Sequence, residues 1–136
     1  MRGAFITFEG VDGSGKTTQL EMLARRLKKA GVAVTIAREP GGTKVGDAIR
    51  RIVLSSKTVT LDPRAELLLY FASRAQNVAQ VILPALKAGR VVLCDRFTDS
   101  SRAYQGRGRG LGLAAVDQID RMSCVRAGAV RMRIRD

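Results

Sequence analysis

The sequence predicts an α/β fold in which helices cover both faces of a parallel β-sheet, giving three layers. Two observations support this prediction. Short apolar runs rich in β-branched residues alternate with segments whose apolar residues recur every three or four positions. Each helical segment also stands between two such runs, as in right-handed βαβ units. The 136 residues are enough for one domain with a single core.

The first elements are a strand, a helix and a second strand. Residues 4–9 (AFITFE) and 32–37 (VAVTIA) are short and rich in β-forming residues, so we predict a strand over each. Between them, Lys16 begins a helical pattern that Gly31 ends. Four apolar residues share one face of that helix: Leu20, Leu23, Ala24 and Leu27.

A loop and two helices are expected next. The stretch REPGGTKVG is predicted as a loop, because Pro40 and the glycines cannot continue a strand. A short helix is expected over 45–54. Pro63 suits the first position of a long helix capped by Asp62, and Pro84 predicts a kink in it.

The last elements are a third strand, a glycine-rich loop and a final helix. Gly89 ends the long helical segment, and residues 90–94 (RVVLC) predict a strand that ends at Asp95. The loop DRFTDSSRAYQGRGRG then leads to a helix from about Leu113 to Met122. Three strands are therefore evident, which is few for a sheet covered on both faces.

Composition indicates a globular protein with phosphate-bearing partners. Hydrophobic residues make up 46% of the chain and charged residues 26%, as in ordinary folded domains. Charge interrupts every apolar stretch well before a membrane span, so we expect no membrane contact and a cytoplasmic location. The net charge of +12 favours nucleotides or nucleic acid as partners. Part of that charge comes from four arginines in residues 123–136.

Cysteine and histidine usage narrows the chemistry. Cys94 and Cys124 have neither the spacing of a redox pair nor that of a metal site, so we expect reduced thiols, with Cys94 buried in a strand. The chain has no histidine. His-based acid–base catalysis is therefore excluded, and a zinc site is disfavoured.

Residues 10–17 (GVDGSGKT) match the phosphate-binding pattern G-x-x-x-x-G-K-[ST] between a predicted strand and a predicted helix. Glycines let backbone N–H groups turn toward a phosphate, and the helix N-terminus adds positive potential. Lys16 can reach nucleotide β- and γ-phosphates, and the Thr17 hydroxyl can ligate Mg²⁺. A glycine-rich turn alone would explain neither residue. The candidate nucleotide-binding residues are Gly10, Val11, Asp12, Gly13, Ser14, Gly15, Lys16, Thr17 and Thr18.

A second candidate site follows the third strand. An acid at the carboxyl end of a parallel strand lies where α/β proteins bind ligands. Asp95 can hold Mg²⁺ through water, and Arg96 can bind a phosphate with two hydrogen bonds. A surface ion pair or a helix cap is the alternative, and the phosphate-binding loop favours the functional interpretation. We therefore expect Lys16, Asp95 and Arg96 as catalytic residues and Thr17 and Asp95 as metal ligands.

Tyr70 and Arg74 form a third candidate site. They lie four residues apart on the predicted long helix and therefore share one face. That face borders the core stripe, which consists of Leu67, Phe71, Val78 and Ile82. A ring with a guanidinium one turn away can stack a nucleotide base and bond its edge. The alternative is an aromatic residue at the rim of the core beside a solvated arginine.

These features together resemble the thymidylate kinase family. The matching segments are FEGVDGSGKTTQ, REPGGT, a helix that ends in YFASR, and VVLCDRFTDSSRAYQG, in the family's order and spacing. The resemblance covers residues 4–122 and implies a three-layer P-loop kinase fold. It also implies phosphoryl transfer from ATP to dTMP with Mg²⁺, giving ADP and dTDP, and a homodimer.

The resemblance implies a role for individual residues. Asp12 would bond the dTMP 3′-hydroxyl, and Tyr104 would exclude a ribose 2′-hydroxyl. Tyr70 would stack on the thymine. The remaining roles are base-edge contact by Arg74, Ser101 and Gln105, phosphate contact by Arg50 and Arg96, and support of the metal and phosphate geometry by Glu39 and Asp95. A nucleoside monophosphate is already charged, so its oxygen can attack without a general base.

The chain departs from the family in its last part. Family members continue past the position of Met122 into further strands, a mobile lid and a last helix. We therefore divide the chain into a kinase core, 1–122, and a basic tail, 123–136, which a truncation, a shifted reading frame or a divergent end would explain. Without those strands, we expect the first strand to become an unpaired apolar edge.

A second departure concerns catalysis. Gly13 stands where some family members carry an arginine, although Arg107 or Arg109 could replace it. Such an arginine can contribute on the order of 10³ or more in rate. Three alternatives to an active thymidylate kinase therefore stay open: a nucleotide-binding fragment without useful catalysis, a P-loop kinase for another small acceptor, and a basic nucleic-acid-binding module. Scattered charges and the absence of a nucleic-acid motif disfavour the last.

Overall fold

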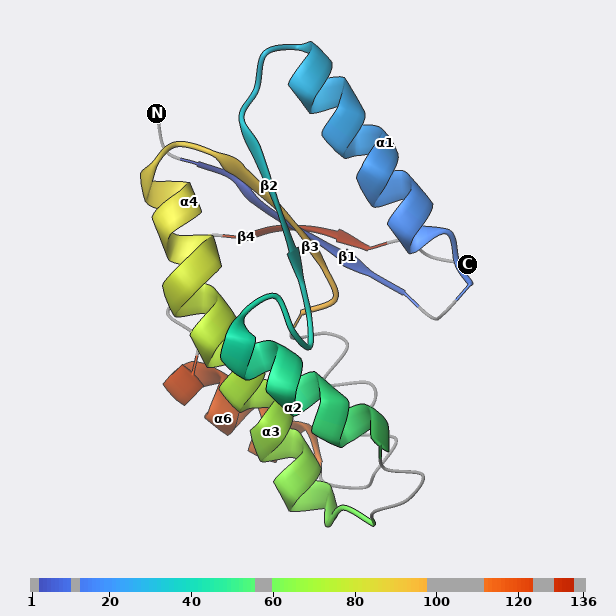
Figure 1. Cartoon of the computed structure of the whole chain (residues 1–136), viewed down its shortest axis with the longest axis vertical. Coiled ribbons are helices and arrows are strands. Elements are labelled where there is room, and N and C mark those ends of the chain that lie inside the picture. Colours follow the sequence, from blue (N-terminus) through green and yellow to red (C-terminus); the bar gives the residue numbers. More distant parts are fainter. Residues whose placement is uncertain (1–2, 11–12, 56–59, 98–111, 124–128, 134–136) are drawn as a thin grey trace.

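A computed structural model describes residues 3–10, 13–55, 60–97, 112–123 and 129–133 (Figure 1). Strands and helices alternate along the chain, as the sequence predicts. The strands are β1 (Phe5–Glu9), β2 (Val34–Arg38), β3 (Val91–Asp95) and β4 (Ala129–Arg133). The helical elements are α1 (Lys16–Lys29), α2 (Lys44–Leu54), α3 (Pro63–Asn77), the π-helical turn η2 (Val78–Ile82), α4 (Leu83–Lys87) and α6 (Leu113–Ser123).

The described strands form one parallel sheet in the order β2-β3-β1-β4. The register aligns the carboxyl ends of its first three strands, because Asp95 of β3 lies opposite both Phe8 of β1 and Arg38 of β2. The segments that follow these strands therefore leave the sheet at the same edge. This is the edge at which α/β proteins bind ligands.

The fourth strand corrects an expectation. β4 lies in the segment 123–136 and pairs in parallel with β1 from Phe5↔Ala129 to Glu9↔Arg133. The prediction that β1 becomes an unpaired edge was therefore wrong, because β1 lies between β3 and β4. β2 and β4 are the edge strands of the described sheet. The proposed division into a kinase core and a tail stays a prediction.

The predicted ends of α1 and α3 are confirmed, whereas α2 begins at Lys44, within the segment predicted as a loop. The Asp62 carboxylate accepts a hydrogen bond from the Arg64 backbone N–H (2.8 Å), and Pro63 follows it as the first residue of α3. Thr43 caps α2 in the same way, through a hydrogen bond from Gly46 N to its hydroxyl oxygen (2.9 Å). Gly31 follows α1 at a φ of 79°, a backbone conformation that favours glycine.

The long helix is irregular before Pro84 rather than at it. η2 occupies the five residues before α4, and Leu83 N donates to the Val78 carbonyl, five residues back. A proline has no N–H, and its ring crowds the carbonyl four residues earlier. A wider π-helical turn at this point lets the helix continue into α4.

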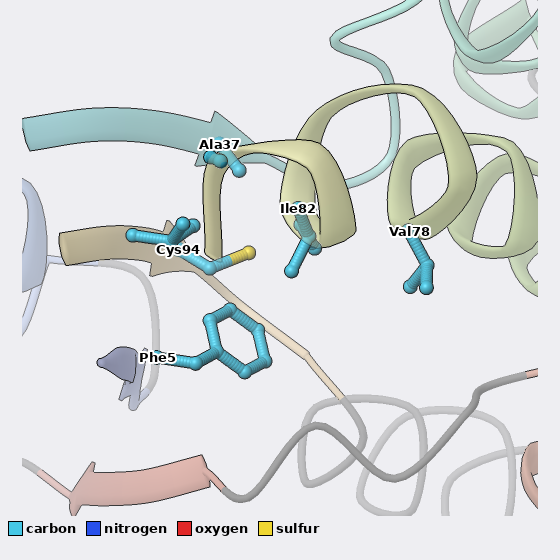
Figure 2. Packing of buried hydrophobic residues seen from close by; sticks show 7 residues of the cluster. Phe5, Ala37, Val78, Ile82 and Cys94 are labelled. Carbon is cyan, nitrogen blue, oxygen red and sulfur yellow. The ribbon is translucent and has the colours of Figure 1, made fainter. Parts of the chain in front are cut away.

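The core lies on both faces of the sheet. One cluster gathers Phe5, Ala37 and Cys94 from three strands against Val78 and Ile82 of η2 (Figure 2). The other packs α1 against the opposite face through Phe8, Leu20, Ala24, Val34 and Leu93. The alternation of Cys94 and Leu93 between the two clusters follows from the two-residue period of a strand. The three-layer α/β prediction is thus confirmed.

Two further expectations concern Cys94 and membranes. Cys94 is a buried free thiol in β3. Burial, followed by the charge of Glu39, raises its pKa well above the ordinary value. Cys124 lies outside the described residues. Among the described helices, none combines the length and the apolar character needed to cross a membrane.

A pair of leucine substitutions tests this core. Leu93 is 0% exposed and Leu54 is 61% exposed. Leu93→Ala should lower the free energy of unfolding by about 2–5 kcal/mol, because it leaves a cavity between β3 and α1. Leu54→Ala should change it by no more than about 0.5 kcal/mol. Urea unfolding followed by circular dichroism measures both values, and equal losses would contradict this assignment of the core.

Candidate functional site

The loop between β1 and α1 has the backbone that a phosphate-binding loop requires. Gly13 and Gly15 have φ angles of 82° and 86°. A Cβ atom on either would meet nothing within 4 Å, so backbone conformation, not space, favours glycine at both. Gly15 directly precedes α1, whose first residue is Lys16. The loop therefore ends at a helix N-terminus, where backbone N–H groups and the helix dipole attract anions.

Lys16 and Thr17 lie next to Asp95, where the carboxyl ends of β1 and β3 are aligned by the strand register. The Thr17 hydroxyl donates a hydrogen bond to Asp95 Oδ2 (3.3 Å), and Lys16 Nζ lies 3.7 Å from Asp95 Oδ1. Lys16 is buried, whereas Thr17 is exposed at the start of α1. Thr17 belongs to one predicted site and Asp95 to the other, and the two residues are 78 positions apart in the chain. The pairing of β1 with β3 brings them together.

The oxygen atoms at this point suit a divalent metal of the magnesium type. Thr17 and Asp95 supply a hydroxyl and a carboxylate, which are hard ligands. Asp95 Oδ1 is buried and accepts no hydrogen bond within the described part of the chain. Among the residues that the structure describes, no group of three or more aspartates, glutamates, cysteines or histidines is arranged to hold a metal ion. Mg²⁺ at nucleotide sites commonly needs only one or two protein ligands, because water and phosphate complete its coordination.

Arg96 leaves β3 in an unusual backbone conformation. Its φ is 67°, in the left-handed region that non-glycine residues rarely occupy. Two hydrogen bonds hold it there: Arg96 N donates to the Phe8 carbonyl (3.0 Å), and the Cys94 thiol donates to the Arg96 carbonyl (3.2 Å). Strained residues that neighbours hold in place are concentrated at functional sites. The sharp turn directs the chain away from β3 immediately after Asp95.

The REPGGT loop is attached to α2 and α3. Arg50, predicted to bind a phosphate, is half-buried and belongs to this attachment. The hydrogen bonds run from Arg50 Nη1 to the Pro40 carbonyl (3.0 Å), from Gly41 N to Ser73 Oγ (3.0 Å), and from Gly42 N to Asp47 Oδ1 (3.0 Å). The peptide bond between Glu39 and Pro40 is cis. The loop therefore has a defined shape beside the end of β2.

Arg74 and Glu39 form a buried ion pair. Arg74 Nε lies 2.5 Å from Glu39 Oε2, and the side chains are 2% and 4% exposed. Burial raises the pKa of Glu39, although the charge of Arg74 and the hydrogen bond that Arg74 donates oppose that shift. The sequence-based alternative of a solvated arginine was therefore wrong. Glu39 N also donates to the Asp95 carbonyl (3.3 Å), which joins this pair to the end of β3.

Two aromatic rings lie against the same guanidinium. The Arg74 guanidinium carbon is 4.8 Å from the centroid of the Phe71 ring and 4.7 Å from that of Phe97. Phe71 was predicted to belong to the core stripe, whereas no role was predicted for Phe97. Phe97 directly follows Asp95 and Arg96 at the end of β3, and this position was the signal from which a role could have been predicted.

The structure thus brings several predicted residues to one edge of the sheet. Lys16, Thr17 and Asp95 lie together, and Glu39 and Arg74 lie beside the end of the same strand. Tyr70 is half-buried one turn before Arg74 on α3. Five of the predicted residues, together with the two loop arginines considered as substitutes, lie outside the described residues: Val11, Asp12, Ser101, Tyr104, Gln105, Arg107 and Arg109.

Comparison with known proteins agrees with this architecture. The family described as Thymidylate kinase matches residues 8–124. A thymidylate kinase from Pelotomaculum thermopropionicum is 60% identical over 121 residues, which cover 89% of this chain and 56% of that protein. One from Citrifermentans bemidjiense is 55% identical over 121 residues, covering 89% and 54%. The chain thus spans little more than half the length of these relatives.

A solved structure leads to the same family. The crystal structure of thymidylate kinase from Ehrlichia chaffeensis superposes on this chain with a TM-score of 0.90 and 40% sequence identity. The match covers 98% of this chain and 75% of that one. The family match extends over most of the sequence and includes the loop before α1 and the end of β3. This chain therefore belongs to the thymidylate kinase family.

Proposed function

We propose that this chain acts in phosphoryl transfer from ATP to dTMP, giving ADP and dTDP. The contact of Lys16 and Thr17 with Asp95 supports this most directly, because it joins a phosphate-binding loop to an acid at the end of β3. The names of the relatives support the acceptor. A cytoplasmic location, with no nucleic-acid or membrane partner, stays part of the proposal.

The donor site in this proposal is the loop before α1. Residues 10–18 bind the ATP phosphates through backbone N–H groups, and Lys16 places its ammonium near the β- and γ-phosphates. Thr17 and Asp95 hold Mg²⁺. When bound with ATP, Mg²⁺ neutralises phosphate charge. The same two side chains are already in contact with each other, so the ligands are pre-positioned.

The acceptor site lies between α2, α3 and the end of β3. Arg50 and Arg96 bind the dTMP phosphate, Tyr70 stacks on the thymine, and Arg74 donates to its edge. The Glu39 carboxylate holds Arg74 in an ion pair, and the Glu39 backbone N–H donates a hydrogen bond to the Asp95 carbonyl. The contacts assigned by resemblance to Asp12, Ser101, Tyr104 and Gln105 complete the proposed acceptor site.

This arrangement needs no general base. The dTMP phosphate carries a charge of about −1.5 to −2 at neutral pH, so its oxygen is ready to attack the γ-phosphoryl of ATP. Bond formation to that oxygen and bond cleavage to ADP occur in line, and the negative charge spreads over the transferring group. The protein contributes position and positive charge, from Lys16 and Arg96.

A nucleotide-binding chain without useful catalysis is the second candidate. One observation favours it: Gly13 offers no cation at the loop, and its φ of 82° suits glycine. A chain of this kind would bind ATP and dTMP but release little ADP. Turnover therefore separates the two candidates.

An ADP-release assay tests the proposal. With Mg·ATP, the purified chain should respond to dTMP more strongly than to dUMP, dGMP or AMP. Thr17→Ala should lower the rate by at least about tenfold, because a metal ligand is lost. Thr60→Ala, at an exposed position outside the site, is the matched control and should leave the rate unchanged. ATP binding without ADP release would support the second candidate, and equal rates with every acceptor would contradict dTMP.

We also propose that the chain forms a homodimer through α2 and α3. Val45 and Ile52 stand seven residues apart on α2 and are 51% and 48% exposed, and Leu68 of the adjacent α3 is 56% exposed. α2 and α3 lie side by side away from the sheet (Figure 1). Exposed apolar side chains of this kind are frequent at protein interfaces.

Sedimentation velocity tests the homodimer. The chain should sediment as a dimer, and Ile52→Glu should shift it toward the monomer, because a buried unpaired carboxylate is costly. Met22→Glu is the matched control, since Met22 is 46% exposed on α1. A wild-type monomer, or an equal effect of both substitutions, would rule out this interface.

A further inference from the structure

Phe97 connects three separate elements of the fold. Its ring meets the Phe5 ring of β1 edge to face, with centroids 5.1 Å apart and planes at 86°. The Arg74 guanidinium carbon of α3 lies 4.7 Å from the centroid of the Phe97 ring. In the chain, Phe97 directly follows Asp95 and Arg96 at the end of β3. One side chain thus links the sheet, the strand end and the long helix.

The surroundings of Arg74 fix the direction of its guanidinium. Its Nε donates to Glu39 Oε2 at 2.5 Å, and Phe71 provides a second ring at 4.8 Å. An aromatic face attracts a cation, most strongly where water is excluded, and Arg74 is 2% exposed. All N–H groups of a guanidinium lie in its own plane. The rings and Glu39 therefore determine where Arg74 can donate.

We propose that Phe97 is a positioning residue for the acceptor nucleotide. It holds Arg74 in the orientation that binds the base edge, and it does so only while the strand end that carries Arg96 is in place. The ring thereby couples base contact by Arg74 to phosphate contact by Arg96. This inference rests on the proposed function, which assigns those two contacts.

Calorimetric titration of the full chain with dTMP, and separately with Mg·ATP, tests the inference. Phe97→Leu removes the ring and should weaken dTMP binding by about 3- to 30-fold while ATP binding stays unchanged. Phe97→Tyr keeps the ring and should bind dTMP as the wild type does. Phe97→Met serves the same comparison if the leucine variant does not fold. Phe8→Leu is the matched control, because it makes the same change in a buried ring of β1 that packs in the α1 cluster, on the opposite face of the sheet from Phe97.

A double-substitution cycle distinguishes positioning from general weakening. Arg74→Lys alone should weaken dTMP binding, and adding Phe97→Leu should weaken it little further, because the ring acts through Arg74. Multiplicative losses, unchanged binding in Phe97→Leu, or an equal loss in Phe8→Leu would overturn the inference while the proposed function stands. A wild-type chain that binds ATP but not dTMP would instead contradict the proposed acceptor, and this role with it, before any variant is compared.

Discussion

The position of β3 between β1 and β2 is the constraint on which the candidate site depends. β3 pairs with both neighbours in parallel, and its Asp95 is level with Phe8 and Arg38. This register sets Asp95 beside the start of α1 on one side and beside Glu39 on the other. The three central residues of β3 are fully buried, so the strand cannot shift without disturbing both faces of the core.

The buried pair of Glu39 and Arg74 extends this constraint to the helices. Two charges in a dry interior lose much of their hydration, and the loss of one partner typically costs about 3–5 kcal/mol. The raised pKa of Glu39 shows the same cost of burial. The pair lies where the loop after β2, α3 and the end of β3 meet, which is also where the acceptor nucleotide is proposed to bind. A function in holding Arg74 explains this position better than a contribution to stability.

Much of the fold was predictable because local signals and packing agree. The strands over 5–9, 34–38 and 91–95 follow apolar runs, and Asp62 with Pro63 marks the start of α3. The strand at 129–133 was missed, although apolar residues and arginine alternate there with a strand period, because arginine-rich character was taken as tail composition. The π-helical turn was also missed, since Pro84 predicts an irregularity but not how the preceding residues absorb it.

The residues of the candidate site could be named from the sequence, but their contacts could not. The loop pattern identified Lys16 and Thr17, and the strand end identified Asp95. Helical spacing placed Arg74 beside Tyr70, yet spacing within one helix cannot show that a carboxylate from the loop after β2 meets Arg74. The role of Phe97 depends on the same kind of distant contact, with rings and charges from α3 and β1.

We expect nucleotide phosphate and metal to bind where the carboxyl ends of β1 and β3 lie side by side. Paramagnetic broadening of backbone amide signals by Mn²⁺, bound together with a non-hydrolysable ATP analogue, measures this directly. Mn²⁺ accepts the same oxygen ligands as Mg²⁺. We predict the strongest broadening at Gly15, Lys16, Thr17 and Asp95, and little at exposed Leu54 of α2. Broadening centred elsewhere, or none at Thr17 and Asp95, would show that phosphate and metal do not bind at this edge of the sheet.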